Sequence, residues 1–151
     1  MAFPAKEAGT LYEQVFIVEA LRRGLQPHLP IGDYLPHDLV VYGSGSVCYR
    51  VQVKGTSCEA KEVRTHHPSM RGRFRVTAAS GKNKKIVDCS EIDILAAYIA
   101  PWDLWYIIPC ENIKSMCVWL YPQPHIRKGK YKTGQYETYK NDWSIFENKK
   151  G

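Results

Sequence analysis

The stretch from Asp38 to Lys54 decides how this chain folds: Asp38-Leu-Val-Val-Tyr42, then Gly43-Ser-Gly-Ser46, then Val47-Cys-Tyr-Arg-Val-Gln-Val-Lys54. Residues 47–54 alternate strictly between apolar and polar side chains, which is typical of a β-strand with one buried face. The apolar run before the turn predicts the partner strand of an antiparallel hairpin. In that hairpin Asp38 lies opposite Val51 or Gln52, depending on the length of the turn.

The polar face of this hairpin gathers groups that can bind a cation. Gln52 and Lys54 share the face opposite the valines, because side chains alternate along a strand. Asp38 lies close to them, at the end of the hairpin away from the turn, where a cleft can open. The plainer alternative is a strand with one solvated face, which alone explains the alternation.

A helix is predicted upstream over residues 10–23, ending at Gly24. Thr10 is its expected N-cap, and Glu13, three residues later, completes a capping box. The helix face expected to be buried holds Glu13 with Phe16, Ile17, Ala20 and Leu21. A buried carboxylate needs backbone donors, a cation or a metal ion beside it, so Glu13 is either a capping residue or a functional acid.

The remaining elements favour an α+β fold. Runs of strand length occupy residues 73–78, 92–99, 105–108 and 115–121. A proline-rich loop follows the helix, segment 56–68 is expected to be loop, residues 80–85 a basic turn and residues 141–147 a short helix. One helix, about six strands and a mixed tail indicate a mainly antiparallel or mixed sheet.

Composition narrows the class of protein. The chain has 151 residues, which predicts one domain, and 21 Lys and Arg against 15 Asp and Glu give a net charge of +6. Such a basic domain often binds a polyanion, most commonly nucleic acid. No apolar run is long enough for a membrane span, and the first 20 residues lack a signal-peptide core, so a cytoplasmic protein is expected. Five cysteines without a CxxC pair favour a reducing compartment over a disulfide scaffold or a zinc knuckle.

Three motifs in order carry a family resemblance: Gly9-x-x-x-Glu13, His37-Asp38-Leu-Val-Val and Val51-Gln-Val-Lys-Gly55. Together they resemble the PD-(D/E)XK nuclease superfamily, in its Gln-variant branch that includes group I intron homing endonucleases. The set is also similar to archaeal Holliday junction resolvases. Asp93-Ile-Leu-Ala-Ala-Tyr-Ile-Ala-Pro101 and Tyr106-Ile-Ile-Pro109 are similar to the paired core strands that follow the motif in that branch.

The resemblance implies a restriction-endonuclease-like α/β fold, with a central mixed β-sheet flanked by helices. It covers residues 9–122 as the core, leaving 123–151 as a basic C-terminal tail. The implied activity is Mg²⁺-dependent hydrolysis of DNA phosphodiester bonds, with Mn²⁺ as a possible substitute. Asp38, Gln52 and the Val53 carbonyl would hold the ion with Glu13 as a direct or water-mediated ligand, and Lys54 would activate or orient the attacking water.

Two positions depart from the family pattern. His37 stands where the superfamily name has Pro, at a position that varies widely. Gln52 stands where most members have Asp or Glu, so it offers a carbonyl oxygen but no charge. The negative charge of the site then depends on Asp38 and Glu13, which leaves open the number of ions bound and admits a catalytically inactive relative.

Basic clusters are candidates for contact with the phosphate backbone. The first holds Arg64, Arg71, Arg73 and Arg75, the second Lys82, Lys84 and Lys85, and the third Arg127, Lys128, Lys130 and Lys132. Each alone can be an ordinary solvated surface. With a nuclease-like site they favour a DNA partner, either a duplex cut as by a homing endonuclease or a four-way junction, and a non-catalytic DNA-binding module remains the alternative. Because one such site cuts one strand, a homo-oligomer, dimer or tetramer, is expected for a double-strand cut.

Overall fold

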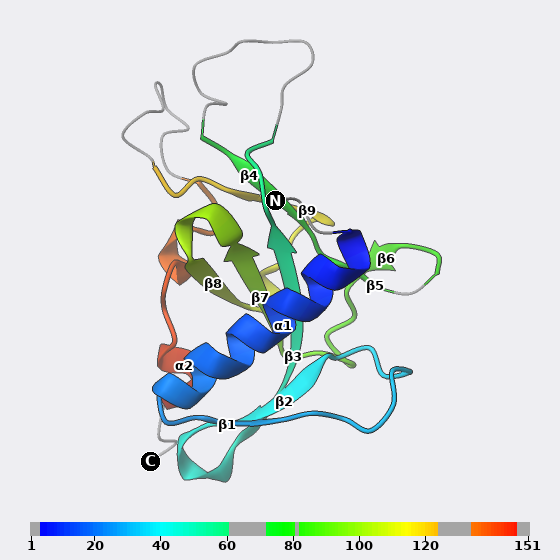
Figure 1. The fold of residues 1–151 in the computed structure, drawn as a ribbon, viewed down its shortest axis with the longest axis vertical. Coiled ribbons are helices and arrows are strands. Elements are labelled where there is room, and N and C mark those ends of the chain that lie inside the picture. Colours follow the sequence, from blue (N-terminus) through cyan, green and yellow to red (C-terminus); the bar gives the residue numbers. More distant parts are fainter. Residues whose placement is uncertain (1–3, 61–71, 81, 124–133, 148–151) are drawn as a thin grey trace.

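A five-stranded mixed β-sheet forms the centre of the molecule in the computed structural model, which describes residues 4–60, 72–80, 82–123 and 134–147 (Figure 1). The strands lie in the order β1-β2-β3-β7-β8. Their bounds are Gln26–His28 for β1, Leu39–Tyr42 for β2, Cys48–Thr56 for β3, Ile94–Ile99 for β7 and Leu104–Pro109 for β8. The mixed sheet confirms the predicted fold class.

The β2–β3 hairpin forms where the sequence predicts it. Leu39 pairs with Val51 in an antiparallel ladder, so that Asp38, one step further, faces Gln52 rather than Val51. The backbone N–H of Asp38 donates to the Val51 carbonyl over 2.9 Å. Gly45 has a φ of 72° within the turn, a conformation that glycine adopts without a Cβ clash. Of the two partners that the sequence allowed for Asp38, Val51 and Gln52, the observed register selects Gln52.

Parallel pairing of β3 with β7 makes the sheet mixed. Gln52 pairs with Leu95 and Lys54 with Ala97, while β7 and β8 form an antiparallel hairpin. All six residues of β7 are buried, as in a strand covered on both faces. Because side chains alternate, Val51 and Val53 face the same layer as Ile94 and Ala96, and Gln52 faces the opposite one.

Helix α1, Ala5–Arg22, covers the first face of the sheet together with α2, Ser144–Glu147 (Figure 1). Tyr12, Phe16 and Ala20 are its buried residues, spaced four apart. The buried face of the helix is rotated slightly from the predicted one, because Leu21, which was expected to be buried, is 59% exposed. The capping box was also wrong: the helix begins five residues before Thr10, whose hydroxyl donates to the Lys6 carbonyl inside the helix.

A second, smaller sheet covers the other face. It pairs β4, Phe74–Thr77, with β9, Cys117–Leu120, and a short hairpin of β5, Ala79–Ser80, and β6, Lys85–Ile86, follows β4. Buried residues of β4 and β9 pack with Leu95, Ala97 and Ile108 of the central sheet. Residues 134–147 pack on both faces: Tyr136 lies in this second layer, whereas Trp143 and Phe146 are buried on the α1 face. The described part of the predicted tail thus contributes buried side chains to the core.

Two features differ from the sequence prediction. Strand β1 lies in the stretch expected to be a proline-rich loop and pairs with β2 along its edge, where Pro27 is tolerated. Cys89 and Cys110 form a disulfide, with a Cα–Cα distance of 5.6 Å. The cysteine pattern favoured a reducing compartment over a disulfide scaffold and did not predict this pair, because only the β7–β8 hairpin brings together two residues 21 apart in sequence. Among the described residues, no helix has the length and apolarity needed to cross a membrane.

Candidate active site

The polar face of the hairpin opens on a depression of about 870 Å³. Asp38, Gln52 and Lys54 line it, with Gly55 beside them on β3. Its other lining residues are Asp33, Tyr34, Leu35 and Pro36 from the β1–β2 loop, Arg75 and Thr77 from β4, Ala79 and Lys84 from the β5–β6 hairpin, and Glu91. The structure therefore brings together the three hairpin residues that the sequence singled out.

A second depression, of about 490 Å³, adjoins the first. It shares Asp38, Lys54 and Gly55 with the larger one and adds Glu13 and Val53. The helical carboxylate and the hairpin acid thus flank the same stretch of β3. Gly55 permits this approach of helix and strand, because a Cβ on it would lie 2.4 Å from the Tyr12 ring.

Asp38 is a partly buried carboxylate with one backbone donor. Its Oδ2 accepts a hydrogen bond of 2.7 Å from the Val53 N–H. Burial raises the pKa of Asp38 above its ordinary value, although the Val53 N–H and the nearby Lys54 and His37 oppose the shift. A carboxylate whose charge is only partly compensated binds a cation readily.

Glu13 lies at the edge of the helix face that packs on the sheet. Burial raises the pKa of Glu13, the negative charge of Asp38 raises it further, and Lys54 lowers it. Glu13 is in the third turn of α1, so a capping function is excluded. Glu13 therefore lies near Asp38 and Lys54, and its role as a functional acid stays a prediction.

Gln52 is buried, with 4% of its surface exposed. Its Nε2 donates to the Pro36 carbonyl over 3.2 Å, which fixes the orientation of the amide. Its Oε1 is buried and has no hydrogen-bond partner among the residues that the structure describes. Since an unpaired buried acceptor is costly, this oxygen is a natural ligand for a cation in the site.

The donor set fits a hard divalent ion. Two carboxylates, the Gln52 amide oxygen and a strand carbonyl are oxygen ligands of the kind that Mg²⁺ prefers, with water completing the shell. Within the described part of the chain, no three His, Cys, Asp or Glu side chains cluster as a metal site. The fit of these residues to a metal ion therefore depends on the unpaired Oε1 of the Gln52 amide.

A family comparison agrees with this geometry. The model of the PD-(D/E)XK endonuclease family matches residues 3–144. This chain belongs to the PD-(D/E)XK endonuclease family. The match spans α1, the hairpin, both later core strands and most of the segment that follows them, so it includes every residue of the candidate site.

A solved structure has the same fold as this endonuclease. It is described as a bacterial homing endonuclease, I-Ssp6803I, and superposes with a TM-score of 0.70. The two sequences are 22% identical over 95% of this chain and 91% of the other, a likeness that shows the fold. A search of curated proteins found no match.

The basic residues predicted to contact DNA differ in their positions relative to the larger depression. Arg75 and Lys84 line the larger depression. Lys82 and Lys85 are exposed on the adjacent hairpin, whereas the Arg73 guanidinium lies 3.9 Å from the Trp119 ring centroid in a cation–π contact. The remaining predicted DNA contacts, Arg64, Arg71, Arg127, Lys128, Lys130 and Lys132, lie outside the described residues.

Sequence reasoning missed the wall contributed by the β1–β2 loop. Tyr34, Leu35 and Pro36 line the larger depression, and Glu91 reaches it from the segment before β7. The only signal in the sequence was a group of apolar residues without helical or strand periodicity, set among prolines. Such a pattern identifies an unusual loop but does not say which site it borders.

Proposed function

We propose that this chain is a divalent-metal-dependent DNA endonuclease that hydrolyses phosphodiester bonds in duplex DNA, in the manner of a homing endonuclease. One observation carries the proposal: Asp38, the orphaned Gln52 oxygen and Lys54 open on one depression, with Glu13 adjoining. Metal-dependent phosphodiester hydrolysis uses oxygen ligands for the ion and a cationic group near the phosphate, and these residues offer both.

Four groups would hold Mg²⁺, or Mn²⁺ in its place. Asp38 and the Gln52 Oε1 would bind from the hairpin, the Val53 carbonyl from β3, and Glu13 from α1 directly or through water. A bound ion supplies Lewis acidity and positive charge at the scissile phosphate. The Val53 N–H fixes the Asp38 carboxylate, and the Pro36 carbonyl fixes the Gln52 amide, so the protein preorganises two of the oxygens.

Lys54 would act on the water and the phosphate. It is close enough to both acids to lower their pKa values. Its ammonium group can orient an attacking water and stabilise the charge that develops on the phosphate oxygens.

The partner would be DNA, contacted by Arg75 and by the lysines of the β5–β6 hairpin. One site cuts one strand, so cutting both strands of a duplex requires a homo-oligomer, a dimer or a tetramer. The place of action would be the cytoplasm.

Cleavage of a plasmid library with randomised inserts, in Mg²⁺, tests the activity against any target sequence that the library contains. The cut ends are sequenced, and a synthetic four-way junction is assayed in parallel. We expect duplex cleavage by the native chain and by Lys114→Met, an exposed lysine that lines neither depression. We expect roughly 1,000-fold slower cleavage by Lys54→Met.

Three outcomes separate the alternatives. Cleavage of the junction but of no duplex identifies a branched-DNA resolvase. Salt-sensitive DNA binding without cleavage in Mg²⁺ or Mn²⁺ identifies a non-catalytic binding module on the same fold. Equal cleavage by Lys54→Met and the native chain contradicts the assigned site.

A further inference from the structure

The loop between β1 and β2 exposes an apolar surface at the edge of the larger depression. We name residues 29–35 the apolar lip. Its exposed fractions are 93% for Ile31, 81% for Tyr34, 57% for Leu29 and 40% for Leu35. Apolar side chains gathered in this way on a folded protein mark a surface that contacts another molecule.

The apolar lip has a defined conformation. Gly32 has a φ of 85°, and a Cβ on it would lie 2.7 Å from Cε1 of Tyr34, so the absence of a side chain lets the Tyr34 ring lie across the turn. Pro30 and Pro36 restrict the backbone on both sides. The Pro36 carbonyl accepts the hydrogen bond from Gln52 Nε2, which ties the end of the lip to the candidate metal site.

Cationic groups line the same depression as the apolar lip. Arg75 of β4 and Lys84 of the β5–β6 hairpin contribute to its lining together with Tyr34 and Leu35. The lip and the β5–β6 hairpin extend to the same side of the molecule (Figure 1). The described lining residues include three acids, Asp33, Asp38 and Glu91, and three cations, Lys54, Arg75 and Lys84. A divalent ion would therefore make the depression net positive when substrate enters.

A DNA duplex presents both kinds of surface that this depression requires. Its phosphates suit the cationic groups, and its base pairs have apolar faces that become accessible where a base step is unstacked. Apolar side chains that enter the minor groove insert between base steps and bend the duplex, and aromatic rings stack on exposed bases. A second copy of the chain docked on the lip would cover Tyr34 and Leu35 and obstruct the catalytic depression.

We propose that the apolar lip is a DNA wedge: Ile31 and Tyr34 enter the minor groove beside the scissile phosphate and unstack a base step there. This inference rests on the proposed endonuclease function and adds a mode of substrate contact. Gln52 links the two, because the same amide that offers Oε1 to the metal site holds the lip through Nε2. The wedge thereby distorts the duplex at a fixed distance from the cutting groups.

Binding measurements with salt variation test the contact. The probe is a 40-base-pair duplex of mixed sequence, in Ca²⁺, with the double variant Ile31→Ala/Tyr34→Ala and the control Leu21→Ala, an exposed leucine that lines neither depression. We expect roughly 10- to 100-fold weaker binding by the double variant and no change for the control. The slope of log K against log salt stays the same, since neither side chain contacts phosphate, whereas Arg75→Ala reduces it by about one.

Plasmid unwinding tests the insertion itself. A relaxed plasmid is bound by protein in Ca²⁺, treated with a topoisomerase and deproteinised, and its linking number is read from the topoisomers. We expect the native chain and Leu21→Ala to shift the linking number, and Ile31→Ala/Tyr34→Ala to leave it unchanged. Circular dichroism of the variants checks the fold, which we expect to persist because both side chains are exposed.

The outcomes separate the wedge from the endonuclease function. Cleavage by the native chain with unchanged binding and unwinding by the double variant overturns the wedge and leaves the function standing. A smaller sedimenting species for the DNA-free double variant assigns the lip to contact between copies and also overturns the wedge. Absence of any cleavage or DNA binding by the native chain overturns the proposed function, and the wedge with it.

Discussion

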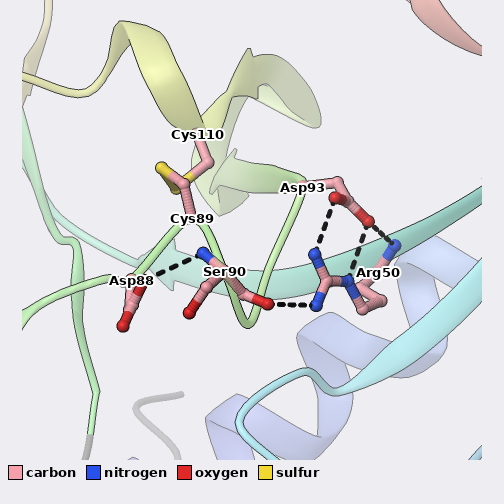
Figure 2. A network of polar contacts seen from close by, with 6 residues as sticks. All are labelled: Arg50, Asp88, Cys89, Ser90, Asp93 and Cys110. Carbon is pink, nitrogen blue, oxygen red and sulfur yellow. Dashed lines mark hydrogen bonds and ion pairs between the residues drawn. A yellow bond between two sulfur atoms is a disulfide. The ribbon is translucent and has the colours of Figure 1, made fainter.

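Two aspartates, Asp38 and Asp93, occupy matching places in the sheet but differ in electrostatic environment. Each stands one residue before a strand that pairs with β3, Asp38 before β2 and Asp93 before β7. Each accepts a hydrogen bond of 2.7 Å from a β3 N–H, from Val53 and Arg50 respectively. Within the described ranges, Asp93 alone of the two also receives a guanidinium: Arg50 donates from Nε over 3.0 Å and from Nη2 over 2.9 Å (Figure 2).

The difference shows how one local arrangement serves two purposes. The Arg50 hydrogen bonds hold the pKa of Asp93 below its ordinary value, while burial raises that of Asp38. Arg50 also donates to the Ser90 carbonyl, so Asp93 belongs to a network that anchors the segment between β6 and β7 (Figure 2). A carboxylate satisfied in this way stabilises the fold, whereas a desolvated carboxylate without such a partner remains available to a cation.

Neutralising each aspartate separates the two roles most sharply. Asp38→Asn should slow cleavage by roughly 1,000-fold, because the charge that would hold the metal is lost. Asp93→Asn should leave cleavage nearly unchanged and lower the free energy of unfolding by about 1–2 kcal/mol, since a partly exposed ion pair is lost. Cleavage rates and urea denaturation measure the two effects. Equal loss of cleavage in both variants would contradict the division.

Reduction of the disulfide tests whether the segment that contains Asp93 stabilises the fold. Cys89 and Cys110 close a loop of 21 residues that contains Asp93 and the β7–β8 hairpin. Reduction should lower the free energy of unfolding by about 3 kcal/mol, as expected for a loop of this length. Urea denaturation with and without dithiothreitol measures it, with Cys58→Ser as the control because Cys58 is a free thiol. An unchanged midpoint would mean that the Arg50–Asp93 network holds this segment alone.

Replacing Gln52 by an acid tests whether its amide stabilises the structure beside Asp38. Gln52→Glu loses the donor to the Pro36 carbonyl and adds charge beside Asp38, so the free energy of unfolding should fall by about 2 kcal/mol at neutral pH. Gln14→Glu, on the exposed surface of α1, should change it little. Thermal denaturation with and without Ca²⁺ measures both variants. A Gln52→Glu protein as stable as the native chain would show that the Pro36 contact is dispensable.

The pH dependence of stability gives the smallest effect, with one sign for Asp38 and Glu13 and the opposite sign for Asp93. The raised pKa values of Asp38 and Glu13 mean that the native state binds more protons than the unfolded state just above the ordinary carboxyl range. Their contribution to stability therefore falls as pH rises through that window. The lowered pKa of Asp93 contributes stability above the ordinary range that is lost as pH falls through its folded-state value.

The effect of Ca²⁺ on the melting temperature distinguishes Asp38 from Asp93 at neutral pH. An ion bound at 100 times its Kd adds about 2.7 kcal/mol to the free energy of unfolding. We expect Ca²⁺ to raise the melting temperature of the native chain and of Asp93→Asn, but not that of Asp38→Asn. A calcium shift that persists in Asp38→Asn would place the ion elsewhere.

Much of the fold was predictable because its signals are local. The alternation in β3, the turn before it and the apolar runs of β7 and β8 identified the core strands. The start of α1 was missed because Thr10 and Glu13 match a capping box that the chain does not use, and the first turn of the helix is exposed instead. Strand β1 was missed because Pro27 disfavours a strand except at a sheet edge.

The residues of the candidate site likewise include some that local sequence signals identified and others that they did not. Spacing along one hairpin sufficed for Asp38, Gln52 and Lys54, and helical periodicity placed Glu13 near the packed face. Nothing local could show that Tyr34, Arg75, Lys84 and Glu91 border the same depression, since they come from four separate segments. The disulfide was missed for the same reason, because its two cysteines meet only across the β7–β8 hairpin.

By itself, the sequence determined which groups can do chemistry, because residue identity and the periods of helix and strand are short-range properties. Tertiary structure alone decided the electrostatic environment of each acid. Arg50 pairs with Asp93, whereas Asp38 is desolvated by burial, because burial and electrostatic pairing depend on neighbours that are distant along the chain.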